Sequence, residues 1–348
     1  MTILTAIVDA HVHLHTCYRA DELLDNAARN LSAACPQNAT GCALYLLMAE
    51  CQQDDCFGQF RELAVSDDPA RRTALGLKEW SIAPTAEDSS VLATSGEQNL
   101  FIVAGRQVAC REGLEVLVLG TTRKFEDGRP IRELLRETEA LRVPRVIPWG
   151  PGKWLFSRGR LLNQLLQEFR KPTLFLGDEG GRPGFWGYPA HFALGARLGV
   201  RDLPGTDPLP FSHDVGKVGR MGFRVPIALD RRRPAASLLR SLTDPNVAFD
   251  RFATLEPPLR FVRNQIGMQL RKRRPPASTS RGPGPNGGGP TGGASAGGPT
   301  HRVSGGPTGG ARAGGPTHRA GGGLRGGAGG PTRGPHAGGP DAGRPLSG

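Results

Sequence analysis

The chain has no long apolar run. No stretch of its 348 residues reaches the roughly 20 apolar residues that a membrane-spanning helix needs. The apolar run at the N-terminus is broken by Asp9 and His11, and no basic segment precedes it, which is not typical of a secretory signal peptide. We therefore expect a cytoplasmic protein without a membrane partner.

The cysteines lack any recognisable spacing. None of the six forms a CxxC pair or a zinc-finger pattern. Scattered cysteines in a long chain without a signal peptide are typical of reduced thiols in the cytosol. The cysteines lie at positions 17, 35, 42, 51, 56 and 110.

Several common catalytic motifs are also missing. Residues 1–274 contain no GxSxG, no HExxH, no P-loop GxxxxGK[ST] and no GxGxxG after an apolar run. These absences argue against a standard serine hydrolase, a zincin, a P-loop enzyme or a dinucleotide-dependent enzyme.

Large apolar residues almost disappear from position 275 onward. Residues 275–348 repeat Gly-Gly-Pro-Thr, and because Gly does not fall at every third position, a collagen helix is excluded. This composition offers too little apolar surface to offset the entropy of ordering, so we expect a disordered tail. Residues 1–274 then suffice for one large domain, a size common among α/β barrels.

The net charge of +12 is divided between these two parts. The tail holds seven Arg against Asp341, so about half of the excess lies there. Such a balance favours anionic partners only weakly, and nucleic acid held by the basic tail is possible but weak. The oligomeric state stays open.

A histidine motif ends the first apolar run. Strict strand alternation would place Asp9, His11, His13 and His15 on one face. Polar groups on a buried strand need partners, and a divalent metal satisfies two imidazoles at once. We therefore predict that His11 and His13 bind a metal; the alternative is histidines bonded to backbone carbonyls.

Short apolar runs then alternate with amphipathic helical patterns. Between residues 90 and 119, β-rich runs separated by Gly-containing turns indicate hairpins. The rhythm predicts an α/β fold, a distorted TIM-like (β/α) barrel with an antiparallel hairpin insertion.

Polar residues follow several of the predicted strands, which is where (β/α) barrels have their active site. Glu50 and Asp178 are candidate metal ligands; the alternative for Glu50 is an ion pair with a neighbouring Arg. Asp207, in a Gly- and Pro-rich turn, is a candidate ligand or general base; the alternative is a turn-capping Asp. Lys153 is a candidate catalytic residue or surface charge, and substrate contacts are expected from Gln107, Arg158 and Arg182.

These motifs resemble the metal-dependent hydrolases of the PHP and amidohydrolase type. The resemblance rests on Asp9-Ala10-His11-Val12-His13, on the segment from Gly105 to Gly120 and on Gly205-Thr206-Asp207. Gln107 stands where a PHP protein has a metal-binding Glu, and Leu209 stands where it has a His. The resemblance implies a barrel with a reduced set of ligands for a divalent metal such as Zn, Mn or Fe.

Three functions follow as alternatives. The first is hydrolysis of a phosphoester in a small anionic substrate by a metal-activated water. The second is C–N hydrolysis of the amidohydrolase type, with Asp207 as proton shuttle, which requires Lys153 to reach the metal. The third is a non-catalytic relative that binds a ligand.

Overall fold

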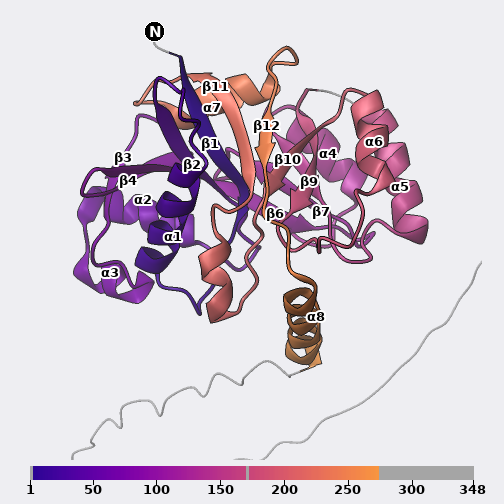
Figure 1. Cartoon of the computed structure of the whole chain (residues 1–348), viewed down its shortest axis with the longest axis horizontal. Helices are drawn as coiled ribbons and strands as arrows, with labels where there is room; N and C mark the ends of the chain where they lie inside the picture. The colour runs from indigo at the N-terminus through magenta and orange to yellow at the C-terminus, as the bar shows by residue number, and fades with distance from the viewer. Residues whose placement is uncertain (1–2, 170–171, 274–348) are drawn as a thin grey trace, which may run out of the picture. The chain divides into compact units, whose positions relative to one another are not determined.

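The computed structural model describes residues 3–169 and 172–273, which belong to one compact unit. The predicted tail, residues 275–348, lies outside the described residues. Within the described part, an α/β fold is confirmed (Figure 1).

Two sheets organise the fold. In the larger sheet β1 pairs in parallel with β2 and antiparallel with β11, and β4 and β5 form the expected antiparallel hairpin. Its strands, in spatial order, are β12 (Asp250–Phe252), β11 (Gly222–Ala228), β1 (Ile3–Val12), β2 (Cys42–Met48), β5 (Gln98–Val103), β4 (Ser90–Ser95) and β3 (Ser81–Pro84).

The smaller sheet combines three parallel strands with a second hairpin. Its strands β8, β9 and β10 run in parallel, and β6 and β7 form the hairpin at one edge. The order is β10 (Arg201–Gly205), β9 (Leu174–Glu179), β8 (Arg145–Pro148), β7 (Glu115–Leu119) and β6 (Gly105–Ala109).

Helices α1 to α6 cover the outer faces of the sheets. In Figure 1, α1, α2 and α3 lie beside the larger sheet, and α4, α5 and α6 lie beside the smaller one. The helices are α1 (Ala20–Ala33), α2 (Cys56–Ser66), α3 (Pro69–Leu75), α4 (Ile131–Glu139), α5 (Phe156–Glu168), α6 (Ala190–Arg197), the 3₁₀ helix η1 (Ser212–Lys217), α7 (Pro234–Thr243) and α8 (Pro258–Arg273).

An apolar core joins the two sheets. Val8 of β1 and Tyr45 of β2 pack in the same buried cluster as Val146 of β8 and Phe175 of β9. Leu238 of α7 belongs to this cluster as well. Burial of apolar side chains from both sheets is therefore what holds them together.

Beyond this core, backbone hydrogen bonds also connect the sheets. Glu50, just after β2, bridges in parallel to Arg106 of β6, and the Asp207 N–H donates to the His11 carbonyl over 2.8 Å. These few bonds do not close one continuous sheet. The strand pairing thus gives two sheets, and the closed TIM-like barrel expected from the sequence is not demonstrated by it.

A β-bulge in β1 changes the expected face of one residue. Asp9 is opposite Leu46 whereas Val12 is opposite Met48, so β1 holds one extra residue between them. Val8 and Ala10 face the core between the sheets, while Val12 packs on the α1 side. The prediction that Asp9 shares a face with His11 and His13 was therefore wrong, because strict alternation fails at the bulge.

The buried Asp9 carboxylate has a structural role instead. It accepts hydrogen bonds from the Thr206 N–H at 2.9 Å, from the Gly219 N–H at 2.9 Å and from the Thr206 hydroxyl at 2.5 Å. Asp9 thus ties β1 to the segment that carries Asp207.

One expectation about the cysteines is contradicted. Cys35 and Cys42 form a disulfide with their Cα atoms 6.2 Å apart, whereas the sequence pattern predicted reduced thiols. Spacing alone did not reveal the pair, because it is the fold that brings Cys35, two residues after α1, to Cys42, the first residue of β2. No helix in the described part of the chain is long and apolar enough to cross a membrane.

Candidate metal centre

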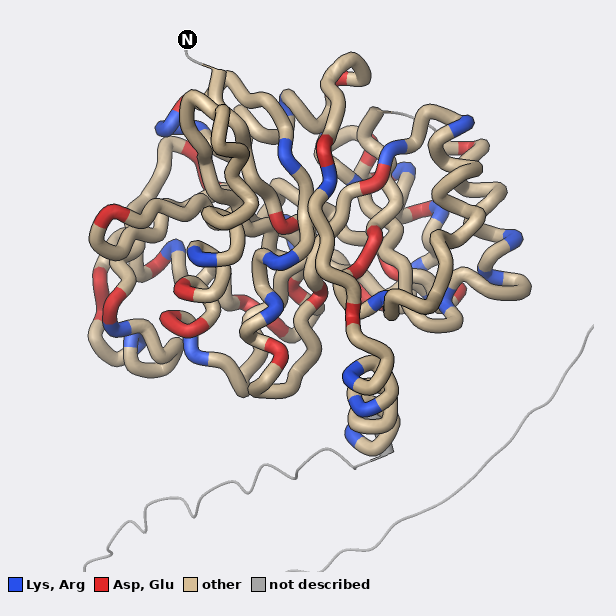
Figure 2. The backbone as a smooth tube through the Cα atoms, viewed as in Figure 1, with Lys and Arg blue, Asp and Glu red and all other residues tan. Residues whose placement is uncertain are grey.

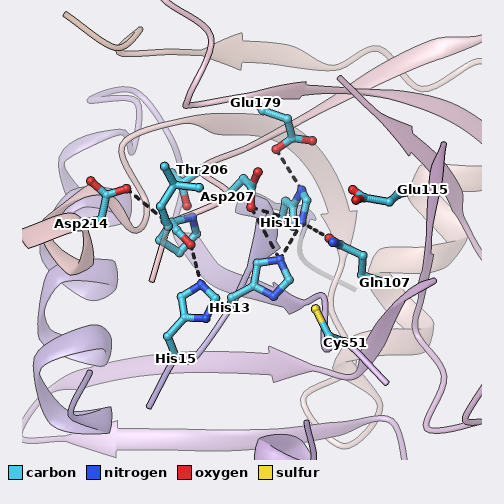
Figure 3. Close-up of polar contacts among 12 residues, drawn as sticks. His11, His13, His15, Cys51, Gln107, Glu115, Glu179, Thr206, Asp207 and Asp214 are labelled. Atoms are coloured by element: carbon cyan, nitrogen blue, oxygen red, sulfur yellow. Dashed lines mark hydrogen bonds and ion pairs between the residues drawn. The ribbon is translucent and has the colours of Figure 1, made fainter. Parts of the chain in front are cut away.

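His11 of β1 and His13, just after it, point toward one another. Their Nε2 atoms lie 3.0 Å apart, and both side chains are buried (Figure 3). The two imidazoles therefore present their ring nitrogens to the same small volume.

Asp207 reaches this volume from the end of β10. A Cβ atom on Gly205 would lie 2.5 Å from the His11 backbone nitrogen, so only glycine permits β10 to approach β1 so closely here. Asp207 itself adopts the left-handed conformation with φ of 42°, an uncommon one for a non-glycine residue. Its Oδ1 lies 3.7 Å from His11 Nε2 and 3.6 Å from His13 Nε2.

Gln107 adds a further oxygen from β6. Its Oε1 lies 2.9 Å from His11 Nε2. Gln107, which was predicted to contact the substrate, therefore lies next to the histidine pair, within hydrogen-bond distance of His11.

Glu179, at the end of β9, fixes the orientation of His11. Its Oε2 accepts a hydrogen bond from His11 Nδ1 over 2.9 Å. A carboxylate on one imidazole nitrogen leaves the other free to bind a metal and raises its basicity. The sequence pattern placed a carboxylate at this strand end but favoured the neighbouring Asp178.

Electrostatics at the site favour a cation. Burial lowers the pKa of His11, but the Glu179 and Asp207 carboxylates outweigh this effect and raise the pKa to about 10. Burial and the His11 charge together lower the pKa of His13 to about 3. Burial raises the pKa of Asp207, yet His11, His13 and Lys153 outweigh it, so that the pKa is lowered. Without a metal, His11 therefore holds a second ring proton, and a metal ion can replace this proton.

The donor set fits a divalent metal. One ligand atom each from His11, His13 and Asp207 lies within 4.8 Å of the others. Bonds of about 2.0–2.2 Å in a tetrahedral site place donors roughly 3.4 Å apart, close to the separations found here. In the metal-free site the proton on His11 Nε2 faces three acceptors, His13 Nε2, Gln107 Oε1 and Asp207 Oδ1, and a cation can take its place.

The site opens into a cleft of about 410 Å³, a size suited to a small molecule. Trp149 and Phe261 provide apolar wall, and Asn264 and Gln265 of α8 provide amides. Figure 2 shows Lys and Arg but no acidic residue on α8. The sequence pattern did not reveal that α8 borders the cleft.

Lys153 lies on the cleft wall and pairs with Glu115. Its Nζ donates to Glu115 Oε2, and both residues line the cleft. Lys153 is thereby positioned to contact an anion in the cleft, while its ammonium is held by a carboxylate rather than by the histidine pair.

Glu50, a predicted metal ligand, is engaged elsewhere. Its Oε2 lies 3.1 Å from Arg106 Nη1, and its Oε1 accepts the Phe57 N–H at the start of α2 over 2.6 Å. The alternative considered from the sequence, a pair with an Arg, is the arrangement found.

Asp178 and Arg182, the predicted ligand and substrate contact, bind each other. Arg182 donates from Nε at 2.7 Å and from Nη2 at 2.9 Å to the two oxygens of Asp178. Arg251 donates to Asp178 as well. The fully buried Asp178 thus faces two guanidinium groups instead of the histidines, because side chains alternate along β9 and Glu179 takes the inward position.

Arg158 also differs from the prediction. Its Nη2 donates to the Gly152 carbonyl over 2.8 Å, and within the described residues it is not part of the cleft wall. Of the predicted substrate contacts, Gln107 borders the cleft, and the predicted catalytic residue Lys153 borders it as well.

Two residues missed by the sequence analysis lie beside His13. Cys51 and Asp54, in the turn after β2, form with His13 a second group whose ligand atoms lie within 4.8 Å of one another. The spacing of the cysteines did not indicate this group, because His13 follows β1 whereas Cys51 and Asp54 follow β2.

No known family model and no curated protein matches the chain. Among solved structures it is similar to PsfC from Pseudomonas syringae PB-5123, with 14% identity and a TM-score of 0.44 over 78% of this chain and 99% of that chain. It is also similar to the lesion-specific endonuclease PfuEndoQ from Pyrococcus furiosus, with 11% identity and a TM-score of 0.40 over 72% of this chain and 58% of that chain.

A third neighbour is a two-domain protein from Bacteroides vulgatus ATCC 8482 that contains a predicted PHP-like metal-dependent phosphoesterase. The identity is 14% and the TM-score 0.36, over 71% of this chain and 64% of that chain. A PHP-like protein is thus among the structural neighbours. At these identities and TM-scores, the similarities do not assign the chain to a family, and its function has to be inferred from the site.

Proposed function

We propose that the protein is a metal-dependent hydrolase of phosphoesters. The observation that carries the proposal is the convergence of His11 Nε2, His13 Nε2 and Asp207 Oδ1 beside a cleft that His13 and Asp207 line. These three residues would hold the ion, with Gln107 Oε1 next to them. The reaction class is the one that the PHP resemblance implies.

A bound divalent metal supplies a water of lowered pKa and a charge that polarises the phosphoryl oxygen. Glu179 keeps His11 Nε2 directed at the metal position, because its Oε2 accepts a hydrogen bond from the His11 Nδ1–H. Lys153 on the cleft wall attracts the anionic group of the substrate. The apolar wall at Trp149 and Phe261 excludes bulk water from one side of the cleft.

The position of Lys153 favours phosphoester over C–N hydrolysis. The amidohydrolase alternative requires the lysine to reach the metal, whereas Lys153 is paired with Glu115. A lysine that lies on the cleft wall, paired with a carboxylate, suits an anionic substrate.

The proposal is tested on the purified full chain by elemental analysis and by activity screens on phosphomonoesters, phosphodiesters and cyclic amides. The double variant His11→Ala/His13→Ala is compared with His191→Gln, which changes a histidine that packs against Trp154 outside the centre. We expect one or more divalent ions per wild-type chain, metal-dependent phosphoester cleavage, and loss of both in the double variant alone.

Other outcomes separate the alternatives. Cleavage of amides in preference to phosphoesters would replace the proposal by the C–N hydrolase. A chain that binds metal and cleaves neither class would be the non-catalytic binding relative. A wild-type chain that takes up no metal at micromolar concentration would contradict all metal-dependent functions.

A further inference from the structure

We propose a second, thiolate-containing metal position next to the first, formed by Cys51, Asp54 and the Nδ1 of His13. One ligand atom from each of these residues lies within 4.8 Å of the others. The ligands that the PHP resemblance implies are histidines and carboxylates, so a cysteine ligand is a property of this chain's own residues.

The strongest sign of a missing ligand is the second nitrogen of His13. The Nε2 of His13 faces His11, but its Nδ1 is buried and has no hydrogen-bond partner among the described residues. His13 is 5% exposed, so water does not readily satisfy this nitrogen. Figure 3 shows the Cys51 thiol beside the His13 ring, on the side away from His11.

The turn that carries Cys51 and Asp54 is already ordered. The Asp54 N–H donates to the Cys51 carbonyl over 3.0 Å, and the Cys51 N–H donates to Asp54 Oδ2 over 3.2 Å. Arg106 holds the turn through its bond to the Asp54 carbonyl at 2.8 Å. The two donors are therefore held in place before any metal binds, which reduces the entropy lost on binding.

Charge around the turn also favours a cation. The carboxylates of Asp54, Glu115 and Asp207 all act electrostatically on the Cys51 thiol. This negative field resists formation of a thiolate alone and attracts a divalent ion. When the second ion binds, the Cys51 thiol releases its proton to solvent. If the first ion is already bound to His13 Nε2, His13 Nδ1 also releases its proton to solvent, and the imidazolate ring of His13 then contacts both ions.

A set of sulfur, imidazole nitrogen and carboxylate oxygen suits Zn²⁺ or a similar divalent ion. The inference shares His13 with the proposed hydrolase centre, but it requires only metal binding and no hydrolysis. Its failure can therefore be distinguished from failure of the proposed function.

The test uses Co²⁺ as a spectroscopic probe for Zn²⁺ on the full chain. A cobalt–thiolate bond gives an intense charge-transfer band in the near ultraviolet, which imidazole and carboxylate ligands do not produce. The variant Cys51→Ser is compared with Cys56→Ser. Cys56 is a matched control because it lies five residues after Cys51 and its thiol contacts the Leu14 carbonyl. Asp54→Asn serves as a second variant, and His11→Ala removes a ligand of the first position only.

We expect two Co²⁺ per chain and a thiolate band in the wild type, in Cys56→Ser and, with a single ion, in His11→Ala. Cys51→Ser should lose the band and one ion while retaining the other, and Asp54→Asn should bind the second ion at least tenfold more weakly. A wild type without the band, or a Cys51→Ser variant that keeps it, would overturn the second position whatever the hydrolase assays show.

Discussion

Glu179 Oε2 lies 2.9 Å from His11 Nδ1, while the other oxygen of the same carboxylate, Oε1, is buried without a hydrogen-bond partner among the described residues. Glu179 therefore orients His11 through Oε2, while Oε1 lies beside Gly177, where an added Cβ atom would be 2.7 Å away. This relationship makes Glu179 a positioning residue for the proposed centre.

The first prediction concerns this pair. Glu179→Gln should weaken metal binding about 10- to 100-fold, because a neutral amide no longer favours the His11 tautomer that exposes Nε2. Metal affinity is measured by competition with a chelator, and circular dichroism checks the fold. Glu97→Gln, in the exposed β4–β5 turn, is the control. Equal metal affinities for the two variants would show that Glu179 does not position His11 for metal binding.

The second prediction uses the close approach of β10 to β1. Gly205→Ala should destabilise the protein by about 1–3 kcal/mol or more and reduce its metal content, because the added Cβ would lie 2.5 Å from His11. Gly184→Ala is the control, since a Cβ there meets no atom within 4 Å. Thermal unfolding and elemental analysis report the two effects. Unchanged values in Gly205→Ala would show that β1 and β10 are not packed as described.

The third prediction separates Asp178 from the metal. Asp178→Ala should cost about 3–5 kcal/mol of stability, since it leaves the buried Arg182 unpaired, yet the folded variant should keep its metal. Asp88→Ala, which removes an exposed pair with Arg61, should cost at most about 1 kcal/mol. Loss of the metal from folded Asp178→Ala would instead restore Asp178 as a ligand, as the sequence pattern predicted.

The fourth prediction concerns pH. Because the pKa of His11 is raised to about 10, the metal-free site carries a proton that the ion must displace. The apparent affinity for the metal should therefore fall about tenfold for each unit that the pH drops below 9. The measurement is made in Cys51→Ser, so that only the first position contributes. A dissociation constant independent of pH between 6 and 8 would contradict a protonated His11.

The position of the histidine motif could be predicted from the sequence, because its signal is local. The apolar run before Asp9 identified β1, and the spacing of His11 and His13 indicated a shared orientation. Likewise, a Gly-rich turn after a short strand marked Asp207. The helices and the hairpins followed from periodicity and turn residues for the same reason. The boundary at residue 274 and the role of the tail stay predictions.

Partners that come from distant parts of the chain could not be predicted in this way. Whether Glu50 faces a metal or Arg106 depends on which strand lies next to β2, and the bulge that turns Asp9 away from His11 depends on the pairing of β1. Residue type alone did not distinguish Asp178 from Glu179, since both are carboxylates at one strand end.

The sequence by itself thus determined which residue types end the strands, because alternation and turn chemistry act over a few neighbours. Only the tertiary structure decided which of them meet. Gly205 lets β10 contact β1 and so brings Asp207 to His11 across nearly 200 residues of chain, and the turn after β2 places Cys51 beside His13. Such contacts are set by the packing of whole strands against one another, which no local pattern records.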